Sequence, residues 1–129
     1  AFKRYLEIAQ TLNKATAVVT DNDGDIEAVK KKYKEYEEIP CIHICVDNVV
    51  DTGDLKLSNK DFNYNTLEPK ILKENGREVM NNIFGTNYNT DDEMHKYMHA
   101  HKTDCAIAIF ESATKIKYPE YIMRAIKNE

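Results

Sequence analysis

The sequence predicts an α/β fold in which helices cover both faces of a mostly parallel sheet. Two short apolar runs, Ala15–Thr20 and Cys41–Val46, have the length and composition of buried strands. A lysine-rich helical pattern over about Ile26–Glu37 lies between them. A strand, a helix and a second strand in this order normally form a parallel pair with a right-handed crossover.

The elements of the first half of the chain have clear local signals. Apolar residues recur at helical spacing over Phe2–Leu12, which predicts an amphipathic helix. The run Ala15–Thr20 is almost wholly apolar and suits a central strand that is covered on both faces. Asp25 is placed to cap the helix over Ile26–Glu37. The second strand, Cys41–Val46, then ends at an aspartate.

The second half of the chain reads mainly as helices. Alternating leucines within Val49–Asn65 predict an edge strand or a hairpin. Pro69 suits the first turn of a helix that opens at Thr66, and Thr90-Asp91-Asp92-Glu93 is a capping box. The remaining predictions are a helix over about Thr103–Ser112 that packs through Ala106, Ile109 and Phe110, a short strand at Lys115–Tyr118, and a helix from Pro119 with Ile122, Ala125 and Ile126 on one face.

Length and composition are those of one soluble globular domain, and we expect residues 1–129 to fold as one unit. The chain has 129 residues, of which 42% are hydrophobic. No apolar run approaches the ~20 residues that cross a membrane, so we expect no membrane partner. The formal net charge is −4, whereas proteins that bind DNA mainly by neutralising phosphates are usually basic. Contact with nucleic acid would therefore require bound metal, local lysines or segments outside this chain.

The three cysteines cannot all pair with one another. Free buried thiols are typical of proteins in a reducing cytoplasm, and a cytoplasmic location is our expectation. The alternative is a metal cluster of Cys41, His43 and Cys45, whose i, i+2, i+4 spacing on a strand would place the three on one face. Zinc sites usually draw a second ligand pair from elsewhere, and the chain has no CxxC.

An acidic cluster follows the first predicted strand. In parallel α/β sheets ligands bind beyond the carboxyl ends of the strands, where Asp21 and Asp23 stand. Residues i and i+2 of a strand share a face, with Cα atoms ~6.5–7 Å apart. Two such carboxylates can hold one magnesium ion, or each can serve one of two ions ~4 Å apart. Asp47 ends the second strand near the same sheet edge and is a weaker candidate, and Asp25 reads as a helix cap.

Three other interpretations compete for the segment DNDGD. A polar turn is the simplest, although a turn needs only one of the two carboxylates. An EF-hand loop is excluded, because position six from Asp21 is Ile26 instead of glycine and position twelve is Lys32 instead of glutamate. A haloacid-dehalogenase-like magnesium-dependent phosphatase remains the alternative function. In it Asp21 would be the nucleophile and Asp23 the acid/base, although Asp25 replaces the threonine of the DxDGT motif.

Several segments, spread over nearly the whole chain, resemble one nuclease family. They are AFKRYLEIAQTLNK, AVVTDNDGD, NTLEPKIL, HKTDCAIAIFES and YPEYIMRAI. In this order they resemble the C-terminal Toprim domain of the overcoming-lysogenization-defect (OLD) family of ATP-dependent endonucleases. The KTD and PEYI segments distinguish this resemblance from primase and topoisomerase Toprim domains, which lack them in this form.

The resemblance implies a Toprim, Rossmann-like fold and a metal-dependent DNA endonuclease that hydrolyses or nicks phosphodiester bonds by a two-metal mechanism. Asp21, Asp23 and Glu68 would bind magnesium or manganese. Lys102 would act with Asp21 and Asp23 in catalysis, as a point charge that stabilises the phosphate or the leaving oxygen. The expected partner is DNA, with a homodimer as a further candidate assembly.

The resemblance also implies that part of the family's architecture lies outside this chain. A Toprim domain normally begins with a strand ending in Glu-Gly, and no such strand precedes Phe2. No P-loop GxxxxGK[ST] occurs in the 129 residues. We therefore expect a C-terminal fragment without its first strand, with ATP acting only through an upstream ATPase domain in cis. On this view the isolated fragment is inactive or nearly so.

Overall fold

The two apolar runs form a parallel pair of strands in the computed structural model, which describes residues 2–127. Strand β1 (Thr16–Thr20) pairs with β2 (Ile42–Val46) in a register that runs from Thr16↔Ile42 to Thr20↔Val46. A helix and a short 3-10 turn (Lys34–Tyr36) connect them. The predicted strand–helix–strand unit is therefore confirmed, and the chain has the mixed α/β class that the sequence indicates.

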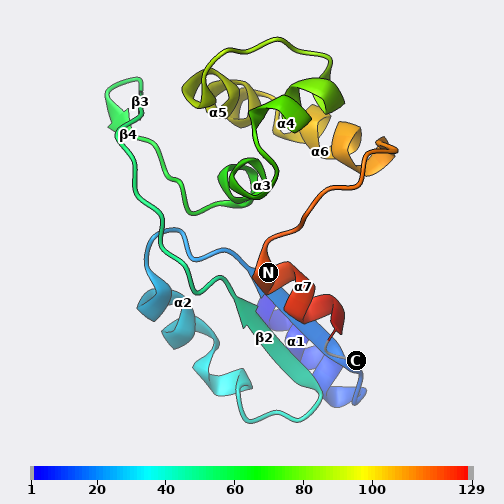
Figure 1. The fold of residues 1–129 in the computed structure, drawn as a ribbon. Helices are drawn as coiled ribbons and strands as arrows, with labels where there is room; N and C mark the ends of the chain where they lie inside the picture. Colours follow the sequence, from blue (N-terminus) through cyan, green and yellow to red (C-terminus); the bar gives the residue numbers. More distant parts are fainter. Residues whose placement is uncertain (1, 128–129) are drawn as a thin grey trace. The chain divides into compact units, whose positions relative to one another are not determined.

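Helices make up most of the remaining structure. Those within residues 2–127 are α1 (Phe2–Thr11), α2 (Ile26–Tyr33), α3 (Leu67–Asn75), α4 (Arg77–Phe84), α5 (Asp91–Ala100), α6 (Lys102–Glu111) and α7 (Glu120–Lys127) (Figure 1). A small antiparallel hairpin of β3 (Lys56–Leu57) and β4 (Lys60–Asp61) confirms the hairpin predicted after β2. None of these helices is long and apolar enough to cross a membrane.

The chain divides into two compact units. Unit 1 contains the described residues up to Val50 and from Glu120 onward, and unit 2 spans Asp51–Pro119. The sequence predicts that residues 1–129 fold as one unit, whereas the structure contains two. Each unit has its own hydrophobic core.

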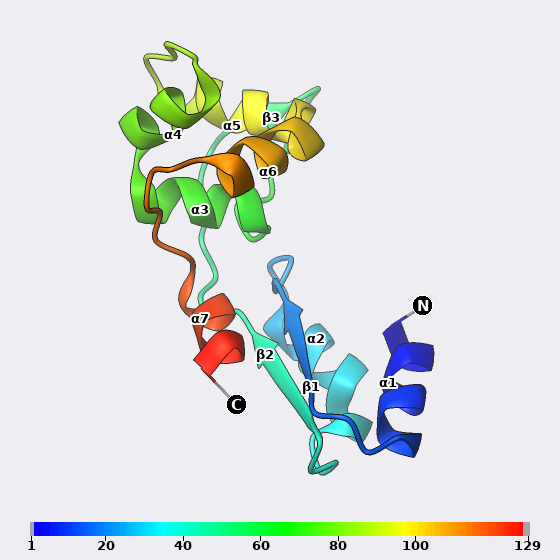
Figure 2. The same cartoon turned by 90° about the vertical axis from the view of Figure 1, so that its right-hand side faces the viewer.

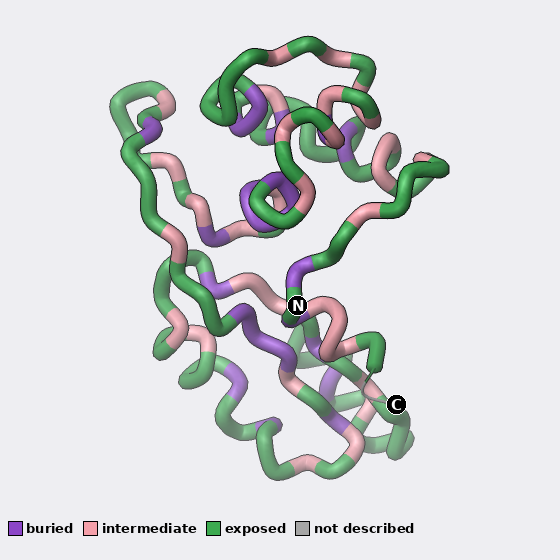
Figure 3. The backbone as a smooth tube through the Cα atoms, viewed as in Figure 1, coloured by how far each residue is buried: buried purple, intermediate pink, exposed green. Residues whose placement is uncertain are grey.

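In unit 1, helices cover both faces of the β1–β2 pair. Leu6 of α1, Val18 of β1 and Tyr33 of α2 are buried together on one face, and α7 lies against the other (Figure 2). Buried positions gather at the carboxyl end of β2 (Figure 3). The prediction that β1 is a fully covered central strand is wrong, since Val19 is 43% exposed. Within residues 2–127, β1 pairs only with β2, so it is not the central strand of a larger sheet.

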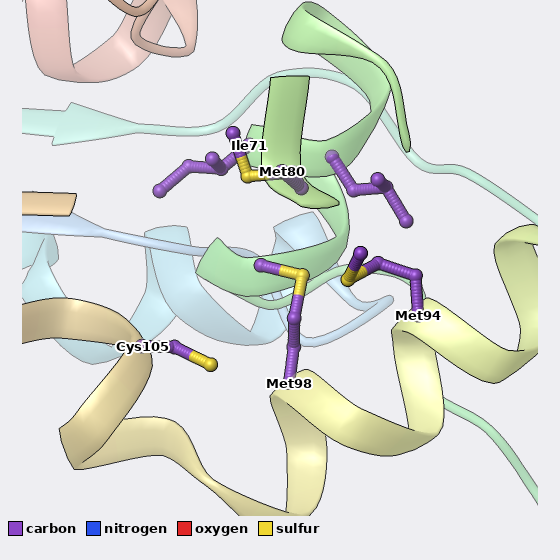
Figure 4. Packing of buried hydrophobic residues seen from close by; sticks show 6 residues of the cluster. Ile71, Met80, Met94, Met98 and Cys105 are labelled. Carbon is purple, nitrogen blue, oxygen red and sulfur yellow. The ribbon is translucent and has the colours of Figure 1, made fainter. Parts of the chain in front are cut away.

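In unit 2, four helices pack around a core rich in methionine. Met80, Met94 and Met98 are almost completely inaccessible to solvent and lie close to Ile71 (Figure 4). The capping box at Thr90 is confirmed. The Thr90 hydroxyl accepts a hydrogen bond from the backbone N–H of Glu93, and the Glu93 carboxylate accepts one from the Thr90 N–H. The capping box confirms the predicted start of α5.

Three predictions about the last third of the chain need correction. Helix α6 begins at Lys102 and buries Cys105, whereas Phe110 is 89% exposed. Residues 115–118 form no strand, because their backbone is bound by a side chain: Lys117 N donates to Asn75 Oδ1 at 2.7 Å, and Asn75 Nδ2 donates to Lys117 O at 2.8 Å. The buried residue of α7 is Tyr121, and Ile126, which was expected on the packed face, is 61% exposed.

Candidate functional site

The segment that follows β1 is a tight turn. Strand β1 ends at Thr20, and the N–H of Asp25 donates to the carbonyl of Asn22 at 2.8 Å. The two residues inside this turn, Asp23 and Gly24, have φ values of 50° and 90°. Glycine adopts positive φ without steric cost, and aspartate is among the few other residues that tolerate it. The prediction that Asp21 and Asp23 share one strand face is therefore wrong: the strand stops before both of them, and the chain turns at Asp23.

Asp25 has the structural role that the sequence predicts. Its Oδ1 accepts a hydrogen bond from the N–H of Ala28 at 3.0 Å, which makes it the N-cap of α2. The cap fixes where the helix begins, directly after the turn. Asp21 and Asp23 thus lie between a strand end and a capped helix.

Asn22 fixes the turn to the segment after β2. Its side chain is completely buried. Its Nδ2 donates to the carbonyls of Asp47 at 3.1 Å and Val49 at 2.8 Å, and its Oδ1 accepts from the N–H of Gly24 at 2.8 Å. The sequence analysis missed this residue, although an asparagine beside a glycine in a turn is a recognisable signal.

Asp47 occupies the same end of the sheet as Asp21. The two residues directly follow the paired ends Val46 and Thr20, and Asp47 N donates to Thr20 O at 3.1 Å. Asp47 is 5% exposed, and its Oδ1 accepts from Val49 N at 3.0 Å. The expectation that it lies near the acidic cluster is confirmed.

The acidic residues at this end have the donor chemistry of a magnesium site. Magnesium prefers oxygen ligands and needs only one or two protein carboxylates, because it keeps several waters. Asp21 is half-buried and Asp23 is exposed. Within residues 2–127, no three His, Cys, Asp or Glu side chains are grouped closely enough to hold a metal by themselves. Any ion here would therefore be held by few protein ligands.

The other two predicted site residues meet in unit 2. Lys102 Nζ lies 3.8 Å from Glu68 Oε1, with side-chain exposures of 52% and 23%. Both stand in the first turn of a helix, Glu68 in α3 and Lys102 in α6. A carboxylate is favoured there by the helix dipole, whereas a cation is not. The helix dipole therefore explains why Glu68 is favourable at its position. It does not explain Lys102, whose only structural role in the described contacts is its pairing with Glu68.

Unit 2 also contains a partly buried charge cluster that the sequence did not indicate. Lys70 is 5% exposed and, together with Lys73, forms ion pairs with Asp51. Burial raises the pKa of Asp51, but hydrogen bonds from the two lysines outweigh it, so this pKa lies below its usual value. The cluster joins the first residue of unit 2 to α3. Its role is anchoring, and no local pattern in the sequence marks it.

The cysteines do not form a ligand group. All three are free, and His43 is exposed whereas Cys45, two positions further along β2, is buried. Burial, followed by the nearby charges of Asp104 and Glu68, raises the pKa of Cys105 to about 11. A thiol with this pKa is protonated near neutral pH and is a poor nucleophile.

Comparison of the chain with models of protein families, with characterised proteins and with solved structures found no match.

Proposed function

We propose that this chain is the catalytic part of a metal-dependent DNA endonuclease of the OLD type, with a Toprim fold, that hydrolyses or nicks phosphodiester bonds. The observation that supports it best is the turn after β1. There Asp21 and Asp23 flank a fully buried Asn22 at the carboxyl end of a parallel strand. This is the place where parallel α/β folds bind their ligands.

The carboxylates of Asp21 and Asp23 would hold magnesium or manganese. When bound, the ion activates a water molecule and neutralises charge that develops on the scissile phosphate. Asn22 keeps the turn in place through hydrogen bonds to Gly24 and to the segment after β2. A bound cation would also offset the net charge of −4, which otherwise opposes contact with DNA.

Lys102 would supply positive charge to the phosphate or to the leaving oxygen. Its contact with Glu68 is long and partly exposed, and such pairs contribute only ~0–1 kcal/mol. Lys102 can therefore leave Glu68 at little cost in order to meet a phosphate. Glu68 would then be available as a ligand for a second metal ion.

Nicking of supercoiled plasmid by the full-length protein that contains this chain, in magnesium or manganese, tests the proposal. Asp21→Ala, Asp23→Ala and Lys102→Ala should each lower the rate by about a hundredfold or more, because each removes a group that acts on the reacting phosphate. Asp54→Ala and Lys31→Ala are matched controls, since both side chains are exposed and lie outside the candidate site. Full nicking activity in the three site variants would show that the site is assigned wrongly.

The same carboxylates could serve a phosphatase, and trapping experiments separate the two functions. In a haloacid-dehalogenase-like enzyme Asp21 is the nucleophile, so beryllium fluoride or fluoroaluminate would form a stable adduct on its carboxylate. The endonuclease proposal expects no adduct. A magnesium-dependent adduct that is lost in Asp21→Asn would support the phosphatase and would rule out the proposed reaction.

A further inference from the structure

A groove in unit 1 runs along the outer edge of β2, the edge that faces away from β1. Its volume is about 630 Å³. Ile42, Ile44 and Val46 of β2 line it, with Lys30 of α2 at one side and α7 at the other. None of the proposed metal ligands lines this groove.

The backbone of β2 is open along this groove. Thr16 N donates to Cys41 O, and Asp47 N donates to Thr20 O, so the odd-numbered residues of β2 pair with β1. Alternation along a parallel ladder then turns the N–H and C=O of Ile44 outward. Within residues 2–127, no third strand pairs with this sheet.

The two ends of the edge are already satisfied. Ile42 N donates to Ile39 O at 3.0 Å, and Arg124 Nη2 donates to Val46 O. The open stretch therefore centres on Ile44. Unpaired strand edges readily accept another strand, and a sheet of only two strands is marginal without further cover. An extended peptide segment is the ligand whose backbone matches such an edge.

The charges around the groove favour a segment with acidic side chains. Lys30, Arg124 and Lys127 line it, against the single carboxylate of Glu37. Lys30 and Arg124 also have carboxylate neighbours on their own helices, but those pairs are exposed and weak. A second copy of this chain, paired edge to edge about a two-fold axis, would bring the same three cations from both copies together. Repulsion between the cations of the two copies opposes this pairing.

We propose that the outer edge of β2 binds an extended acidic segment of a partner protein, which adds a strand beside β2. The segment would make backbone hydrogen bonds to Ile44. Its carboxylates would lie near Lys30, Arg124 and Lys127. This inference does not depend on the proposed nuclease activity, because it uses other residues.

The test measures binding of a fluorescein-labelled peptide by anisotropy, both to the 129-residue chain and to the full-length protein, in which an upstream strand that already occupies the edge would prevent binding. The peptide has β-branched residues in its centre and glutamates at both ends. A second version is N-methylated at alternate central residues, which removes backbone donors without changing charge. We expect saturable binding that weakens by about fivefold or more on N-methylation, since the loss of one backbone hydrogen bond, ~1 kcal/mol, corresponds to about fivefold in affinity.

Variants of the chain test the charges and the edge separately. The double variant Lys30→Glu, Lys127→Glu should weaken binding of the acidic peptide, whereas Lys31→Glu is a matched control on the same helix outside the groove. Ile44→Pro should abolish binding, because it removes the outward N–H at an edge position where proline is tolerated, and circular dichroism checks that unit 1 stays folded without the Ile44 side chain, which packs against its core. In contrast, His43→Pro removes a donor to β1 and should disrupt the sheet.

Several outcomes would overturn the proposal. They are absence of saturable binding, equal affinity for the N-methylated peptide, and an equal effect of Lys31→Glu and the double variant. Sedimentation that shows a dimer disrupted by Ile44→Pro would assign the edge to a second copy of the chain. Displacement of the peptide by a single-stranded oligonucleotide, with affinity that N-methylation does not change, would assign the groove to nucleic acid.

Discussion

Replacing Asn22 with alanine should destabilise unit 1 more than its position in a polar turn suggests. The side chain is completely buried and makes three hydrogen bonds, at 3.1, 2.8 and 2.8 Å. Each such bond contributes ~1 kcal/mol net, and buried groups left without partners cost more. Asn22→Ala should therefore lower the free energy of unfolding by about 3 kcal/mol. This corresponds to a fall of roughly 10 °C in the melting temperature.

Amide hydrogen exchange is the assay best suited to this prediction, because it reports each part of a two-unit chain separately. The amides of β1 and β2 should lose protection in Asn22→Ala. The Gly24 N–H, which donates to Asn22 Oδ1, should exchange fastest of all. Asn48→Ala is the matched control: this asparagine is exposed, and its loss should change stability by less than ~0.5 kcal/mol.

Asn22→Asp separates shape from hydrogen bonding. The variant keeps the volume and the acceptor for Gly24 N, but it places a carboxylate oxygen against the carbonyls of Asp47 and Val49. We expect a loss of stability at neutral pH at least as large as that of Asn22→Ala. The pKa of the new carboxyl should be raised in the folded state. Stability should therefore be regained at pH values below the pKa of this carboxyl in the unfolded state, and lost as pH rises through its pKa in the folded state. A loss of less than ~1 kcal/mol in both variants would refute the idea that the hydrogen bonds of Asn22 hold the turn in place.

Three further predictions concern unit 2. Met98→Ala should lower the free energy of unfolding by about 2–5 kcal/mol, because Met98 is 1% exposed, whereas Phe110→Ala should change it by less than ~0.5 kcal/mol in urea denaturation. With a pKa of about 11, Cys105 should resist iodoacetamide in the folded chain and react once urea unfolds it, as read by mass spectrometry. The folded pKa of Asp51 is lowered, so its contribution to stability is present above the unfolded value of ~3.9 and is lost as pH falls through the folded pKa. Lys70→Met should weaken the fall in the free energy of unfolding at acid pH, as measured by denaturation curves at a series of pH values. An unchanged fall would contradict its assignment to the ion pair between Asp51 and Lys70.

Local signals explain why much of the element order could be predicted. Asp25 and Thr90 act as caps whose partners lie three residues away, so their roles can be read within one turn of sequence. Gly85 has a φ of 66°, which only glycine adopts at no cost, and a glycine after a helix is a local signal for the end of α4. The apolar runs that form β1 and β2 are equally local.

The errors arose where a distant partner decides the outcome. Residues 115–118 look like a strand, but the backbone of Lys117 is bound by Asn75, 42 positions earlier in the chain. Helix α6 is apolar on several sides, so the sequence does not show whether Cys105 or Phe110 packs inward. In β1 the apolar character of Val19 predicts burial, but elements elsewhere in the chain decide whether its face of the strand is covered.

The candidate site shows the same division between local and distant information. A DxD pattern treats its middle residue as a spacer, because only the two carboxylates can bind a metal. In this chain the middle residue is the one that is completely buried, and its hydrogen bonds reach Asp47 and Val49 beyond the second strand. Those partners are invisible in the motif, and so is the positive φ of Asp23 that brings the second carboxylate off the strand. Substitution of Asn22 should therefore disturb the geometry of both carboxylates while leaving their chemistry intact, which distinguishes a positioned site from a merely acidic turn.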